Sequence, residues 1–123
     1  MKNILTWKTF AVLTAALLVF GAGVLFGFAN KPKSVIHVVT IDWNEGADIE
    51  AALAGVDKIS ETYPGVTRVW TRSIKAQGRQ AAFVMEFKDE QALTDYAGSD
   101  AQKEWYKIYE PARAMSRTFD ITN

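Results

Sequence analysis

The chain has 123 residues, which leaves room for one folded domain once a terminal apolar segment is set aside. It has no cysteine, so disulfides, thiolate nucleophiles and cysteine-based metal sites are excluded. Its 14 basic and 14 acidic groups balance overall. Four of the basic groups and none of the acidic ones lie in residues 1–33, so residues 34–123 hold 10 basic groups against 14 acidic ones. Nucleic acid binding needs clustered positive charge, and no nucleic acid partner is therefore expected.

Residues 9–29 form an apolar run without charge, bounded by Lys8 and Lys31. As a helix, this run would extend for roughly 32 Å, about the thickness of a hydrocarbon core. We therefore expect residues 1–33 to be an N-terminal transmembrane anchor with its linker, and residues 34–123 to be the folded domain.

A cleavable signal peptide is the alternative interpretation of this segment, because Lys2 and Lys8 precede it and small residues stand at Gly27 and Ala29. The apolar run is longer than the usual core of a signal peptide, which favours an uncleaved anchor. Lysines flank the segment on both sides, so the positive-inside rule gives almost no preference for either orientation in the membrane. Both interpretations agree on an extracytoplasmic domain, and we expect a single-pass membrane protein.

Two glycines inside the apolar run, Gly23 and Gly27, have the small-xxx-small spacing that lets two membrane helices approach closely. They are candidate helix–helix packing residues. A plain anchor without helix pairing is the alternative.

The domain opens with residues 35–43, a β-branched run that predicts a strand buried on both faces. Apolar residues then recur at helical spacing and predict an amphipathic helix over residues 47–63. The turn at Pro64 and Gly65 ends that helix.

Residues 66–74 and 80–88 predict two strands, and the turn at 75–79 makes them a hairpin. Helix-start signals at 89–91 and at Ser99 predict two further helices. The second of these is expected to bury Trp105, Ile108, Tyr109, Ala112 and Met115. Residues 117–121 then supply a final strand.

The element order β-α-β-β-α-α-β predicts an α+β, ferredoxin-like fold, with one antiparallel sheet and its helices on one face. Apolar side chains occupy both faces of this sheet, since Phe83 and Met85 alternate with Val84, and Trp70 opposes Val69. A domain this small cannot cover both faces by itself. We therefore expect a homodimer in which two sheets close a dimeric α/β barrel.

The domain resembles the stress-responsive dimeric α/β-barrel (Dabb) family across residues 34–123. The resemblance rests on short motifs in the expected order: Val35-Ile36-His37, Pro64-Gly65-Val66, Val84-Met85-Glu86-Phe87, Leu93-Thr94-Asp95-Tyr96 and Pro111. Antibiotic-biosynthesis monooxygenase domains share this fold and are the nearest competing family.

His37 is the one histidine and the first candidate for catalysis, because imidazole can exchange a proton near neutral pH. The alternative is a core histidine that bonds a neighbouring element. The family's plant polyketide cyclases have a catalytic tyrosine, which the resemblance places at Tyr96, and a catalytic histidine, which falls on Gln102. An amide cannot act as a general base, so the cyclase pair is incomplete, although His37 also has a counterpart in that family's pocket.

Five side chains are expected to line a pocket for a small apolar or aromatic ligand: His37, Trp70, Tyr96, Trp105 and Tyr109. Plain core packing is the alternative for the aromatic ones. No metal and no cofactor are expected, because the acidic loop residues Asp42, Glu45 and Asp48 lack the pattern of a calcium loop.

Three functions therefore stay open. The domain binds a small molecule without converting it, or it is a cofactor-independent monooxygenase or cyclase that uses His37, or it is a structural dimerisation module with a filled interior.

Overall fold

The computed structural model describes residues 32–123, and residues 33–123 form a compact unit. The expected anchor, with Gly23 and Gly27, lies outside the described residues. Within residues 32–123, no helix has the length and apolar character needed to cross a bilayer.

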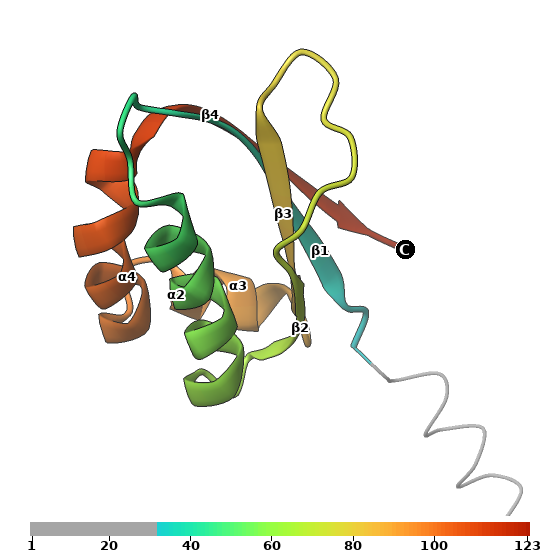
Figure 1. The fold of residues 1–123 in the computed structure, drawn as a ribbon. Helices are drawn as coiled ribbons and strands as arrows, with labels where there is room; N and C mark the ends of the chain where they lie inside the picture. Colours follow the sequence, from blue (N-terminus) through green and yellow to red (C-terminus); the bar gives the residue numbers. More distant parts are fainter. Residues whose placement is uncertain (1–31) are drawn as a thin grey trace, which may run out of the picture. The chain divides into compact units, whose positions relative to one another are not determined.

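The described chain folds into four strands and three helices around one antiparallel sheet (Figure 1). In chain order these elements are β1 (Val35–Trp43), α2 (Ile49–Thr62), β2 (Val66–Trp70), β3 (Ala81–Phe87), α3 (Glu90–Tyr96), α4 (Asp100–Ala112) and β4 (Arg113–Thr122). The strand order is β2-β3-β1-β4, so the first strand of the chain lies at the centre and the last at an edge. The predicted ferredoxin-like α+β fold is confirmed.

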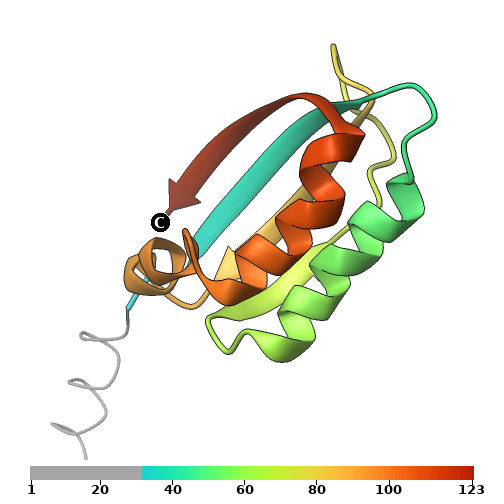
Figure 2. The ribbon, with the colours of Figure 1, turned by 90° about the vertical axis from the view of Figure 1, so that its left-hand side faces the viewer.

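One face of the sheet carries the helices, with α2 and α4 side by side across it (Figure 2). Strand alternation turns Phe83, Met85 and Phe87 toward this layer, and all three are buried. From α4, the rings of Trp105 and Tyr109 stack with their centroids 4.2 Å apart, and each meets the Phe83 ring edge to face. The aromatic part of the hydrophobic core therefore lies between β3 and α4.

The two long helices approach each other closely at Gly55 of α2. The indole nitrogen of Trp105 donates to the carbonyl of Ala52 at 2.8 Å, which draws the ring onto the α2 backbone. A Cβ on Gly55 would lie 2.4 Å from Cδ1 of Trp105, well inside contact distance. A residue without a side chain is thus required at Gly55 for Trp105 to keep its position.

The second strand ends earlier than the predicted 66–74, because β2 stops at Trp70. Beyond it, the hydroxyl of Ser73 accepts the backbone N–H of Ala82 at 3.2 Å and replaces a bond between the two strands. The chain from 71 to 80 is a loop, and Ile74 within it is fully exposed.

The last helix also ends earlier than predicted, at Ala112, and the chain enters β4 directly. Arg113 adopts an extended conformation, donates its N–H to the carbonyls of Tyr109 and Glu110, and pairs with Trp43 of β1. Met115 therefore belongs to a strand and is half-exposed, and Ile108 is 45% exposed on α4. The prediction that these two side chains are buried was wrong.

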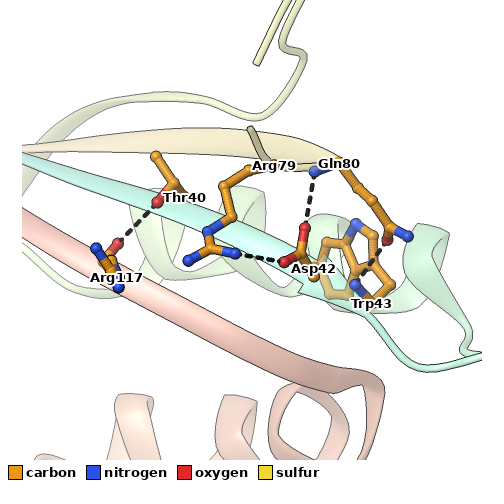
Figure 3. Close-up of polar contacts among 6 residues, drawn as sticks. All are labelled: Thr40, Asp42, Trp43, Arg79, Gln80 and Arg117. Carbon is orange, nitrogen blue, oxygen red and sulfur yellow. Dashed lines mark hydrogen bonds and ion pairs between the residues drawn. The ribbon is translucent and has the colours of Figure 1, made fainter. Parts of the chain in front are cut away.

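Asp42, near the end of β1, binds the 71–80 loop through its carboxylate (Figure 3). One carboxylate oxygen accepts from Nη1 of Arg79 at 2.8 Å, and the other accepts from the backbone N–H of Gln80 at 3.0 Å. The Gln80 side chain in turn accepts the N–H of Trp43 at 2.8 Å. The Asp42–Arg79 ion pair thus holds the loop where β1 and β3 meet.

Candidate functional site

A cavity of about 330 Å³ lies between the sheet and the helices α3 and α4, along the β4 edge. Its volume falls in the range of small-molecule sites. The sheet contributes His37, Val39, Phe83, Met85, Ser116, Thr118 and Asp120. The helices contribute Leu93, Thr94, Tyr96, Gln102, Trp105, Tyr106 and Tyr109, and Ala97 and Arg113 complete the lining. The strand β4, which lines one side of the cavity, lies at the edge of the sheet (Figure 2).

One end of the cavity holds a histidine–carboxylate pair. His37 and Asp120 are register partners on β1 and β4, and Nδ1 of His37 lies 2.6 Å from Oδ1 of Asp120. A carboxylate only accepts hydrogen bonds, so Nδ1 carries the proton, and the pair fixes the orientation of the ring. Nε2 has no hydrogen-bond partner among residues 32–123 and is available to a ligand.

A buried hydroxyl without a partner marks the same end. Tyr96 is 3% exposed, its ring packs 5.3 Å from Phe87, and its Oη has no hydrogen bond within the described chain. Burial raises the pKa of Tyr96, and also that of Tyr106, so both are neutral phenols that can donate a hydrogen bond. A buried polar group left unpaired costs about 1–3 kcal/mol, which an accepting ligand would recover.

Gln102, where the resemblance places a catalytic histidine, also lines the cavity. Its Oε1 accepts the backbone N–H of Gly98 at 2.7 Å, and its Nε2 lies 3.4 Å from the Tyr106 hydroxyl. The amide therefore orders the chain between α3 and α4 and positions a phenol. It supplies no base.

The structure brings together four of the five predicted ligand-binding residues, His37, Tyr96, Trp105 and Tyr109. Trp70 lies elsewhere: it pairs with Val84 on the face of the sheet away from the helices, 43% exposed beneath Arg68. It does not line this cavity.

Asp120, Arg113 and Tyr106 line the cavity but were not among the predicted site residues. The alternation of β4 places Ser116, Thr118 and Asp120 on one face, and this period-two pattern of polar residues was a signal for the position of Asp120.

A larger hollow, about 410 Å³, lies on the outer surface between α2 and α4. Its charged side chains are Lys58, Asp100 and Glu104, and Glu104 already accepts from Lys107 at 2.6 Å. This outer hollow contains neither a histidine nor an unpaired buried group. The smaller cavity along β4 contains both and is therefore the better candidate.

Removing the unpaired hydroxyl provides a test of this cavity. We expect Tyr96→Phe to leave the free energy of unfolding unchanged or to raise it by up to about 1 kcal/mol, because a costly buried group disappears. Tyr63→Phe is the matched control: its hydroxyl donates to the carbonyl of Ala92 at 3.1 Å, so its loss should cost about 1 kcal/mol. Urea denaturation measures both, and equal destabilisation by the two variants would contradict the assignment.

No protein-family model matches the sequence, and no curated protein is significantly similar to it. Solved structures do match its fold. A Dabb family protein with a ferredoxin-like fold from Mesorhizobium loti is 21% identical, with a TM-score of 0.59 over 74% of this chain and 97% of the other. A dimeric ferredoxin-like protein from Thermobifida fusca is 14% identical, with a TM-score of 0.62 over 76% and 93% of the two chains.

An enzyme is also similar in structure. The hydroxynitrile lyase of Passiflora edulis is 17% identical, with a TM-score of 0.60 over 75% of this chain and 94% of the lyase. The TM-scores show a shared fold, and at identities of 14–21% they show the fold alone, so the activity has to be argued from the site.

Proposed function

We propose that the domain is a Dabb-like module that binds a small apolar or aromatic molecule in the cavity beneath β4. The observation that carries this proposal is the unpaired Tyr96 hydroxyl beside a 330 Å³ space walled by aromatic rings. Such a combination of apolar area and a few polar groups is typical of ligand sites. It also argues against a purely structural module, whose interior would be filled.

Filling the cavity tests the proposal. Thr118 lines the cavity from β4, and Thr118→Trp should occupy much of the space. The full chain, purified in detergent and denatured, should release a small molecule detectable by mass spectrometry, and the variant should lose it. Thr122→Trp is the control, because Thr122 follows the same face of β4 but lies outside the cavity. Equal ligand content in wild type and Thr118→Trp would contradict the proposal.

We further propose that the domain works as a homodimer, joined through the face of the sheet without helices. Four large apolar side chains on this face are 43–56% exposed: Trp70, Met115, Phe119 and Ile121. Val38 lies between Phe119 and Val84 in register, so the apolar surface continues across the sheet. A contiguous apolar surface of this kind is typical of an interaction site.

Charged groups surround this apolar surface, as at protein interfaces generally. Arg68 is the register partner of Glu86, the Asp42–Arg79 pair lies at the far end, and Arg117 follows on β4. Both signs of charge are therefore present, which lets the face be complementary to itself. A second copy is the occupant we propose, and the dimeric ferredoxin-like protein of T. fusca shows that this fold supports dimers.

We also retain the proposal that residues 9–29 anchor the protein in a membrane with the domain outside the cytoplasm. The support is the uncharged apolar run. Two tethered domains would have a raised effective concentration for each other, and Gly23 and Gly27 would let their helices approach. The full chain should stay in the membrane fraction after carbonate extraction, whereas a cleaved signal peptide would release it.

A second function, proton transfer by His37, is favoured by one observation, the 2.6 Å bond that orients the ring at the cavity. With Nδ1 protonated, Nε2 can remove a proton from a bound ligand. The test is deuterium exchange of the methyl protons of an aryl methyl ketone in D₂O, followed by NMR. His37→Ala should slow exchange by about 10²-fold or more while binding changes little, and unchanged exchange would exclude this function.

A further inference from the structure

The candidate cavity has chemically different ends. His37, Asp120 and Tyr96 lie at the end near the start of β1, while Arg113 lies near its far end, opposite Trp43. Nη1 of Arg113 reaches Ser116, four residues from Asp120 along β4 (120 − 116 = 4), which corresponds to about 13 Å. Aromatic rings form the wall between the two ends.

Arg113 is held in place but keeps most of its hydrogen-bonding capacity. Its guanidinium carbon lies 5.3 Å from the centroid of the Tyr109 ring, and Nη1 donates to the Ser116 hydroxyl at 3.3 Å. The nearest carboxylate, on Glu110, is 3.9 Å from Nη2 and half-exposed, so the ion pair is long and weakened by solvent. Several of the five N–H donors of the guanidinium remain for a ligand.

The charges in the cavity favour an anion at Arg113. Asp120 is the other charged residue with a fixed sign in the lining, and its carboxylate is already bonded by His37 at the opposite end. Arg113 is therefore the lining residue whose charge no other lining residue neutralises, since its ion-pair partner Glu110 lies outside the lining. The Arg113 side chain is 33% exposed, and a guanidinium can bind a carboxylate through paired, charge-assisted hydrogen bonds.

We propose that the ligand is an aromatic carboxylic acid, whose carboxylate binds Arg113 and whose ring lies against the wall formed by Phe83, Trp105 and Tyr109. This inference rests on the proposed binding function and names the ligand class. A polar group at the other end of such a molecule would meet the Tyr96 hydroxyl and Nε2 of His37.

The test compares 2-naphthoate with 2-naphthamide, which have the same rings and differ in charge. Calorimetry on the full chain in detergent should show 2-naphthoate binding at least about tenfold more tightly than the amide. Arg113→Gln should remove this preference, and Arg113→Lys should keep part of it, because lysine retains the charge but lacks the paired geometry. Arg117→Gln is the matched control, on the opposite face of the same strand, and should change neither affinity.

The outcomes separate the two proposals. Equal affinity for the acid and the amide in the wild type, or an acid preference that survives Arg113→Gln, would overturn the assignment of Arg113 while leaving the binding function in place. No binding of either probe would overturn both. The comparison in the wild type needs no variant, so a folding defect of Arg113→Gln would not decide the result.

Discussion

A Phe119→Asp variant is expected to be monomeric at concentrations where the wild type is a dimer. Phe119 is 54% exposed on the edge strand β4, where it belongs to the apolar sheet face and pairs with Val38 of β1. In a symmetric dimer the substitution introduces one charge per protomer into the same interface, where a buried unpaired charge costs several kcal/mol. We expect the dimer dissociation constant to rise by about 100-fold or more, which corresponds to about 2.8 kcal/mol.

Ile108→Asp is the matched control, because Ile108 is also a large apolar residue, 45% exposed, but lies on α4 in the helix layer. Light scattering on the full chain, corrected for detergent, should show an unchanged dimer for this variant. If Ile108→Asp dissociates the protein and Phe119→Asp does not, the dimer interface lies on the helices and the proposal for the sheet face is wrong.

Most elements could be predicted from the sequence because their periodicity is strong. The β-branched run over 35–43 matches β1 at both ends, and helical spacing located α2 to within two residues. The ends of β2 and β4 could not be predicted, because they depend on contacts between distant segments. The Ser73 hydroxyl accepts the backbone N–H of Ala82 in β3, in place of a bond from β2. Arg113 pairs with Trp43 of β1, and β4 therefore begins at Arg113.

The candidate site was predictable where a rare residue type marked it. His37 is the only histidine, and Tyr96, Trp105 and Tyr109 are large aromatics at helical spacing, so they could be named without knowing the sheet. Asp120 could not be assigned as the partner of His37, because a shift of one residue in the pairing of β4 with β1 would turn it to the other face.

Trp70 shows how register decides the location of a side chain. A bulge between Val66 and Arg68 places Val66 and Val69 on the helix side, although they are three positions apart, and turns Trp70 away. A strict period of two could not reveal this change of face. Trp70 instead adds to the surface that we propose to be the dimer interface.

Replacing Phe83 by alanine is expected to lower the free energy of unfolding by about 3–5 kcal/mol. The side chain is 1% exposed and meets both Trp105 and Tyr109 edge to face. Since Phe83 also lines the candidate cavity, its loss would join a new void to an existing one, and the surroundings could not close around it. Such a loss is a large part of the 5–15 kcal/mol that stabilises a typical domain.

Phe83→Leu is the control, because it conserves most of the volume and should cost less than about 1.5 kcal/mol. Chemical denaturation at one fixed protomer concentration measures both variants, since the stability of a dimer depends on concentration. A ligand with an aromatic ring should restore part of the stability lost in Phe83→Ala, because the ring can occupy the enlarged space between Trp105 and Met85. If Phe83→Ala without ligand lowers the free energy of unfolding by less than about 1 kcal/mol, the cavity walls must close freely around the missing ring. A cavity that closes so readily could not be the preformed binding site that we propose.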